Sequence, residues 1–126
     1  KKTLALAESC TGGAISALIT SEPDASLYFL GSLVVYSNDW KERFLQVSRS
    51  TLEISGAVSS ETIREMTEGL LQETNADFTI AVSGILGPSG GTKLKPVGSV
   101  YIAIGEREGA IDLGLLHTPN DRSSAS

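Results

Sequence analysis

The 126-residue chain is poor in the residues that mark several protein classes. Its one cysteine, Cys10, excludes an internal disulfide framework and is typical of a reducing compartment, so we expect a cytoplasmic location. No apolar run approaches the roughly 18 residues of a membrane span, and no signal-peptide pattern is present. The net charge of −5 argues against nucleic acid or an anionic membrane as the main partner. This charge does not exclude the binding of a small ligand.

Motifs for metals and nucleotide cofactors are also missing. No group of histidine, cysteine and carboxylate residues has metal-ligand spacing, and neither a P-loop nor a Gly-x-Gly-x-x-Gly fingerprint occurs. We therefore expect no metal and no cofactor. The only histidine, His117, ends an apolar run beside Thr118 and Pro119, and we interpret it as a surface or core-edge residue rather than a catalytic one.

The composition that is present, 40% hydrophobic and 20% charged, is ordinary for one globular domain over residues 1–126, at whose ends we expect truncation. Apolar runs predict strands at residues 4–7, 27–36, 78–83, 97–104 and 111–116, with a bulge at Gly31. Helices are expected after the glycines at 12–13, after an Asn38 cap, from a capping box at Ser50, and from Ser59 or Ser60 to a C-cap at Asn75. This order predicts a three-layer α/β/α sandwich on a mixed, mostly parallel sheet.

A strand, a tight turn and a helix start are predicted for residues 5–13, with the sequence Ala-Leu-Ala-Glu-Ser-Cys-Thr-Gly-Gly. Such a turn is expected to leave several backbone N–H groups unpaired, at the positive end of the helix dipole. Ser9 would then be a nucleophile with oxyanion donors beside it. The alternative is that Ser9 or Thr11 simply caps the helix.

A serine nucleophile needs a base, and Lys41 is the candidate because histidine is scarce. With Asn38 as the cap, Lys41 falls in the first turn of a helix, where the dipole and partial burial lower a lysine pKa. The alternative is a lysine that points into water. Tyr36 either packs on the core or bridges the nucleophile and the lysine through its hydroxyl. Cys10 is an alternative nucleophile, which we interpret instead as a small buried hydrophobe.

A glycine-rich segment follows the strand that ends near Ser83. The sequence Ser-Gly-Ile-Leu-Gly-Pro-Ser-Gly-Gly-Thr at residues 83–92 is either a flexible connection or a nest of N–H groups for a phosphate, with Thr92 adding a hydroxyl. Because this segment, Ser9 and Tyr36 all follow predicted strands, we expect them to meet at one edge of the sheet.

Taken in order, these motifs resemble the CinA C-terminal domain family (competence/damage-inducible protein CinA), whose characterised members are nicotinamide mononucleotide deamidases of the PncC type. The motifs are residues 7–13, Tyr36-Ser37-Asn38 with Lys41, and residues 56–59, 83–92 and 95–98. The resemblance implies a metal-independent serine amidohydrolase of pyridine nucleotide salvage, which forms nicotinate mononucleotide and ammonia. It also implies a homodimer.

By the same resemblance, Ser9 attacks the carboxamide, Lys41 takes and returns the proton, and Tyr36 assists them. The glycine-rich segment and Arg122 are implied contacts to the ribose phosphate. The residues expected to bind the substrate are Thr11, Gly12, Gly13, Ser83, Gly84, Gly90, Gly91, Thr92 and Arg122.

A second hypothesis is a nucleotide-binding or regulatory module that has lost catalysis. Ser83 motivates it, because the family usually has threonine there. The intact set of Ser9, Tyr36 and Lys41 argues against it, since a module without catalysis has no physical reason to keep all three.

Overall fold

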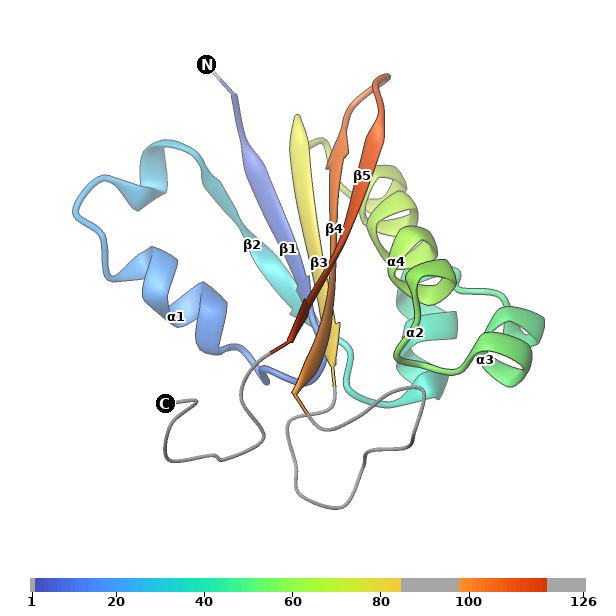
Figure 1. Cartoon of the computed structure of the whole chain (residues 1–126). Helices are drawn as coiled ribbons and strands as arrows, with labels where there is room; N and C mark the ends of the chain where they lie inside the picture. The colour runs from blue at the N-terminus through green and yellow to red at the C-terminus, as the bar shows by residue number, and fades with distance from the viewer. Residues whose placement is uncertain (1, 85–97, 118–126) are drawn as a thin grey trace.

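The computed structural model describes residues 2–84 and 98–117, which form a five-stranded sheet with helices on both faces (Figure 1). No helix among these residues has the length and apolar character needed to cross a membrane. In chain order, the elements are β1 (Leu4–Glu8), α1 (Ala14–Thr20), the 3₁₀ turn η1 (Ala25–Leu27), β2 (Phe29–Val34), α2 (Asn38–Leu45), α3 (Arg49–Ser55), α4 (Ser60–Glu73), β3 (Phe78–Gly84), β4 (Ser99–Glu106) and β5 (Ile111–His117).

The strand order is β2-β1-β3-β4-β5. Strand β1 pairs in parallel with both β2 and β3, and the two later pairs, β3 with β4 and β4 with β5, are antiparallel. Four strands therefore run in one direction, and β1, β2 and β3 end at the same edge. Helix α1 lies on one face of the sheet, and α2, α3 and α4 lie on the other (Figure 1). The predicted three-layer α/β/α sandwich is confirmed.

The main core lies between the sheet and α4. Small side chains on the inner strands allow the helix to approach closely, and long apolar side chains on α4 fill the space between them. Its buried members are Ala5, Ala7, Val35, Leu45, Val47, Ile63, Met66, Leu70, Ala76, Ala81 and Ala103.

Two predicted helix starts are wrong by a residue or two. Ser37, not Asn38, caps α2: its backbone is extended and its hydroxyl accepts a hydrogen bond from the Trp40 amide at 3.1 Å. Ser48, not Ser50, caps α3 in the same way. In each case an earlier serine has the extended backbone that a cap requires, and the predicted cap already lies inside the helix.

Other local predictions have mixed outcomes. Ser59 is confirmed as the cap of α4, but the helix ends at Glu73 and its C-cap is Thr74, which has an extended backbone, so the predicted C-cap at Asn75 is wrong. Strand β2 is shorter than predicted, since residues 25–27 form a 3₁₀ turn. The predicted bulge is confirmed beside Gly31, where the β1–β2 register skips one residue.

Candidate functional site

Ser9 lies directly after β1, at the edge where the three parallel strands end. Its amide donates to the Val82 carbonyl of β3 at 3.1 Å, and its side chain is buried. Side chains alternate along β1: Ala7 belongs to the core beneath α4, whereas the Glu8 carboxylate binds the start of α1. Ser9 therefore faces the α2–α4 side of the sheet.

Lys41 comes from α2 on that same side and is only 1% exposed. Its Nζ donates to the carbonyl oxygens of Val35 at 3.1 Å and Tyr36 at 2.9 Å, directly after β2. Val35 in turn donates its amide to the Glu8 carbonyl at 2.9 Å, so the amine lies one strand away from the end of β1. The segment that accepts from the Lys41 amine therefore lies beside the end of β1, the strand that Ser9 follows.

The charge state of Lys41 is set by its burial. Desolvation lowers its pKa below the ordinary value, and a thiolate charge at Cys10 would act in the opposite direction. Among the described residues the one salt bridge joins Arg49 to Glu42, so the Lys41 amine has no ion-pair partner there. Two neutral carbonyl acceptors therefore face an amine that burial drives toward its neutral form.

The turn after Ser9 is built on two glycines with positive φ, Gly12 at 61° and Gly13 at 102°. Only glycine adopts this left-handed backbone without strain, so the sequence permits the chain to reverse within four residues. The expected set of unpaired amides is wrong for most of the turn. Gly12 donates to the Ser9 carbonyl, Ala14 donates to the Thr11 carbonyl, and Gly13 donates to the carboxylate of Glu8.

Glu8 is the residue that sequence reasoning missed. Its side chain is 0% exposed, and it accepts hydrogen bonds from three amides and two hydroxyls, those of Thr11 and Ser16. Burial raises its pKa, but the hydrogen bonds, led by that of the Ser16 hydroxyl, outweigh burial and leave the pKa lowered. A charged residue that ends an apolar strand just before a helix was the available signal.

Two amides beside Ser9 stay available. Within residues 2–84 and 98–117, the amides of Cys10 and Thr11 donate to no other residue. The Cys10 side chain is half-buried, and burial raises the pKa of its thiol, while its own amide, the Gly84 amide and Lys41 oppose that rise. The end of β1 and the turn after it thus carry the Ser9 hydroxyl and two amides with no acceptor on another described residue, and the carbonyls that hold the Lys41 amine directly follow the neighbouring strand β2.

Ser83 and Gly84 lie at the end of β3, beside Ser9. The Ser83 side chain is 1% exposed and its hydroxyl donates to the Ala57 carbonyl at 3.2 Å, tying the strand to the segment before α4. A Cβ on Gly84 would lie 2.6 Å from the Ser99 carbonyl oxygen, so this glycine is needed for the approach of β4. Both residues are therefore placed at the predicted edge.

Tyr36 is placed differently from its predicted bridging role. Its side chain is 76% exposed, and its hydroxyl bonds to no residue in the described ranges. It is the main-chain oxygen of Tyr36 that contacts Lys41. The remaining predicted contacts, Gly90, Gly91, Thr92 and Arg122, lie outside the described residues.

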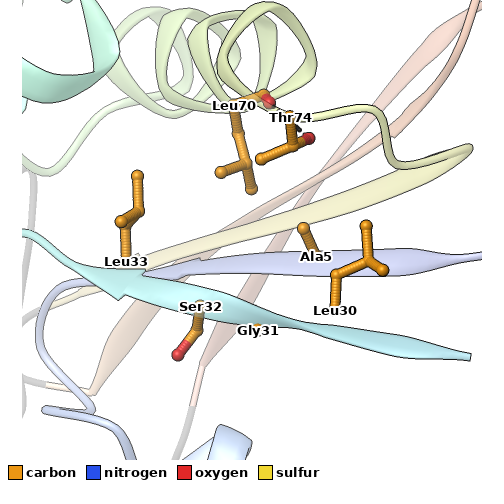
Figure 2. Close-up of a pocket in the computed structure, with 7 residues that line it drawn as sticks. All are labelled: Ala5, Leu30, Gly31, Ser32, Leu33, Leu70 and Thr74. Atoms are coloured by element: carbon orange, nitrogen blue, oxygen red, sulfur yellow. Dashed lines mark hydrogen bonds between the residues drawn. The ribbon is translucent and has the colours of Figure 1, made fainter. Parts of the chain in front are cut away.

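A separate cavity of about 220 Å³ lies between β2 and α4 (Figure 2). None of the predicted site residues lines it. Ser32 and Thr74 are its only hydroxyl-bearing residues, and the other lining residues are Ala5, Leu30, Gly31, Leu33 and Leu70. It lacks the ionisable groups that hydrolysis would need.

Comparison with known proteins identifies the family of the chain. The model of the CinA C-terminal domain matches residues 1–126. A CinA-like protein of Thermotoga maritima is 56% identical over 108 residues, which are 86% of this chain and 26% of that protein. A CinA-like protein of Leptospira interrogans is 46% identical over 124 residues, which are 98% of this chain and 30% of that protein. The chain thus spans less than a third of these relatives.

Solved structures agree with the fold. The crystal structure of competence/damage inducible protein CihA from Agrobacterium tumefaciens is similar with a TM-score of 0.93 and 37% identity, covering 98% of this chain and 76% of that one. The competence damage-inducible protein A (ComA) from Klebsiella pneumoniae gives a TM-score of 0.90 and 35% identity, with the same coverage.

Proposed function

Because the chain belongs to the CinA C-terminal domain family, we propose that it is a nicotinamide mononucleotide deamidase. In this proposal it is a metal-independent amidohydrolase of pyridine nucleotide salvage, which releases ammonia and nicotinate mononucleotide. Ser9 is the nucleophile and Lys41 is the general base. The names of the relatives state no reaction, so the activity rests on the site chemistry and the family resemblance.

The observation that supports this proposal most strongly is the environment of the Lys41 amine. A neutral amine has two N–H donors and one lone pair, whereas an ammonium has three donors. The carbonyls of Val35 and Tyr36 accept two hydrogen bonds, which match the neutral form and leave its lone pair to accept a proton. Burial favours the same form by lowering the pKa. A buried lysine in this state is suited to activate a serine.

The reaction then follows in two halves. Ser9 gives its proton to the Lys41 amine as its oxygen bonds to the carboxamide carbon, and the developing oxyanion accepts hydrogen bonds from the amides of Cys10 and Thr11. Lys41 returns the proton to nitrogen as the carbon–nitrogen bond breaks, releasing ammonia and leaving an ester on Ser9. Water, deprotonated by Lys41, cleaves that ester and regenerates the serine.

Substrate binding completes the proposal. The pyridine nucleotide would lie over the edge formed by Ser9 and Ser83, with its phosphate on the glycine-rich segment and Arg122. A homodimer is part of the same proposal. Each of these contacts stays a prediction from the resemblance.

The second candidate is a nucleotide-binding module without catalysis. It draws support from two observations: the Ser83 hydroxyl already has an acceptor on Ala57, and the ring of Tyr36 is turned to solvent. The buried amine of Lys41 favours the enzyme, since a binding module gains nothing from desolvating a lysine.

Ammonia release from nicotinamide mononucleotide tests the proposal, with and without EDTA. Turnover should survive EDTA and fall at least about 10³-fold in Ser9→Ala and Lys41→Ala, as for loss of a nucleophile or its base. The matched controls are Ser26→Ala and Lys2→Ala, which change exposed residues and should keep full activity. Binding of the nucleotide without ammonia release by the folded wild type would favour the module instead.

A further inference from the structure

We propose that Glu8 is a positioning residue for the nucleophile, acting through the turn rather than on the substrate. This inference rests on the proposed function, because it concerns how Ser9 is presented for attack. The Glu8 carboxylate holds residues 9–13 in one conformation, which fixes the Ser9 hydroxyl relative to the amides of Cys10 and Thr11.

Both carboxylate oxygens of Glu8 are fully used. Oε1 accepts from the Thr11 hydroxyl and from the amides of Gly13 at 3.2 Å and Ile15 at 3.1 Å. Oε2 accepts from the amide of Ser16 at 2.8 Å and from its hydroxyl. Five donors around a side chain with no exposed surface make a rigid group, because each bond limits the movement of the others.

The carboxylate supplies a cap that α1 otherwise lacks. The N-cap position is Gly13, which has no side chain to accept from the first turn. Glu8 accepts from that turn although it precedes the N-cap by five residues. Its negative charge also lies at the positive end of the helix, which stabilises it there.

The turn is therefore fixed at both ends by one residue. The main chain of Glu8 lies in β1, where its carbonyl accepts the Val35 amide, while its side chain holds the start of α1. Ser9 lies between these two anchors. A small loss of constraint here would change the direction of the Ser9 hydroxyl directly, since Ser9 is the next residue in the chain.

The same bonds divide the amides of the turn by role. The amides of Gly13, Ile15 and Ser16 are taken by Glu8 and are not available to an anion. The amides of Cys10 and Thr11, next to the nucleophile, donate to no other residue within 2–84 and 98–117. The start of α1 thus serves to hold the turn, and the oxyanion of the proposed reaction would accept from the amides of Cys10 and Thr11.

The test compares Glu8→Gln with Thr67→Val. Glutamine keeps the size but replaces one acceptor oxygen with a donor, which opposes the amides it faces. Thr67→Val breaks a buried hydrogen bond to Thr79, on the α4 side of the sheet, and serves as a control of comparable thermal loss. For Glu8→Gln we expect kcat to fall about 100-fold, as for a misplacement near 1 Å, while KM changes less than about threefold. Thr67→Val should keep kcat.

A second readout separates this inference from the choice of substrate. Labelling of Ser9 by a fluorophosphonate reports the presentation of the hydroxyl without nicotinamide mononucleotide, and its rate in Glu8→Gln should fall in the same ratio as kcat. Wild-type labelling without ammonia release would overturn the proposed substrate and would leave the Glu8 inference to stand or fall by the labelling ratio. A folded wild type that is not labelled at Ser9 would overturn both.

If Glu8→Gln does not fold, Ser16→Ala and Ser16→Thr give the answer. Alanine removes one of the five donors and should lower both kcat and the labelling rate by a smaller factor, whereas threonine keeps the hydroxyl and should restore them. Unchanged kcat and labelling in Glu8→Gln, or in Ser16→Ala where that variant is used, together with a lowered Tm would show that Glu8 only stabilises the fold, and would refute the inference.

Discussion

Helix α2, which carries Lys41, meets helix α4 at Gly69, and this contact offers a sharp test of how the base is placed. A Cβ at position 69 would overlap the carbonyl oxygen of Leu45 and would lie 2.6 Å from its carbonyl carbon. The atoms in the way belong to the backbone at the end of α2, so no side-chain rotation can relieve the overlap. Gly69→Ala must therefore move one helix relative to the other.

The size of the effect follows from the contact distance. Ordinary van der Waals contact begins at 3.4 Å and the Leu45 carbonyl oxygen is the nearest atom, so the helices must separate by about 1.5 Å. Overpacking of this kind costs about 3 kcal/mol, and the better helix propensity of alanine offsets about 1 kcal/mol. The net loss of about 2 kcal/mol corresponds to a fall in Tm of about 8 °C. Since Lys41 is one turn from Leu45, turnover should fall about 100-fold.

Thermal denaturation and ammonia release measure the two effects separately. Gly114→Ala is the matched control, because a Cβ there meets nothing within 4 Å and the residue lies in a strand with ordinary backbone. It should leave both Tm and turnover near those of the wild type. A Gly69→Ala protein with wild-type Tm would refute the steric argument, and one with lowered Tm but full turnover would refute the claim that α2 sets the position of Lys41.

Three further predictions follow from individual contacts. Burial lowers the pKa of Lys41 in the folded state below its ordinary value of 10.5. Between the folded-state pKa and 10.5 the unfolded state binds more protons than the folded state, so the free energy of unfolding should rise with pH across that window. Tm measured against pH should show this rise in the wild type and not in Lys41→Met. Arg107 donates to three carbonyls at the end of α4, so Arg107→Ala should lower the unfolding free energy by about 2 kcal/mol in urea titration, and an unchanged value would contradict this capping role. Cys10→Ala should keep turnover within about threefold if Ser9 is the nucleophile, whereas loss of ammonia release in a folded Cys10→Ala protein would favour the thiol.

Local patterns in the sequence were sufficient for the order of strands and helices. Apolar runs predicted β1 and β3, with β-branched residues in β3, and the helical spacing of Ile63, Met66 and Leu70 predicted the buried face of α4. These signals are strong because each depends on neighbours within one or two turns of chain. Helix boundaries were predicted less well. The observed caps of α2 and α3 lie one or two residues before the predicted ones, because several nearby serine and asparagine residues are all good caps.

The candidate site was predictable where it depended on strand ends. Ser9 follows β1, and Ser83 lies near the end of β3. These two strands are parallel neighbours, so both serines lie at one edge of the sheet, as the α/β pattern predicts. The burial of Lys41 was not predictable from its position in a first turn, since an exposed lysine has the same local sequence. Tyr36 shows the reverse case, because its main chain takes part in the site while its ring lies in solvent.

The sequence by itself thus determined the α/β class, the glycine turn after Ser9 and the strand ends beside which the candidate site residues lie. Only the tertiary structure decided the charge environment there. Lys41 is dehydrated because the fold buries its amine against the carbonyls of Val35 and Tyr36, which follow β2. Glu8 is held because α1, which starts six residues later, returns to the end of the same strand. Burial and long-range hydrogen bonds depend on which surfaces meet, and local spacing in a chain does not specify that meeting.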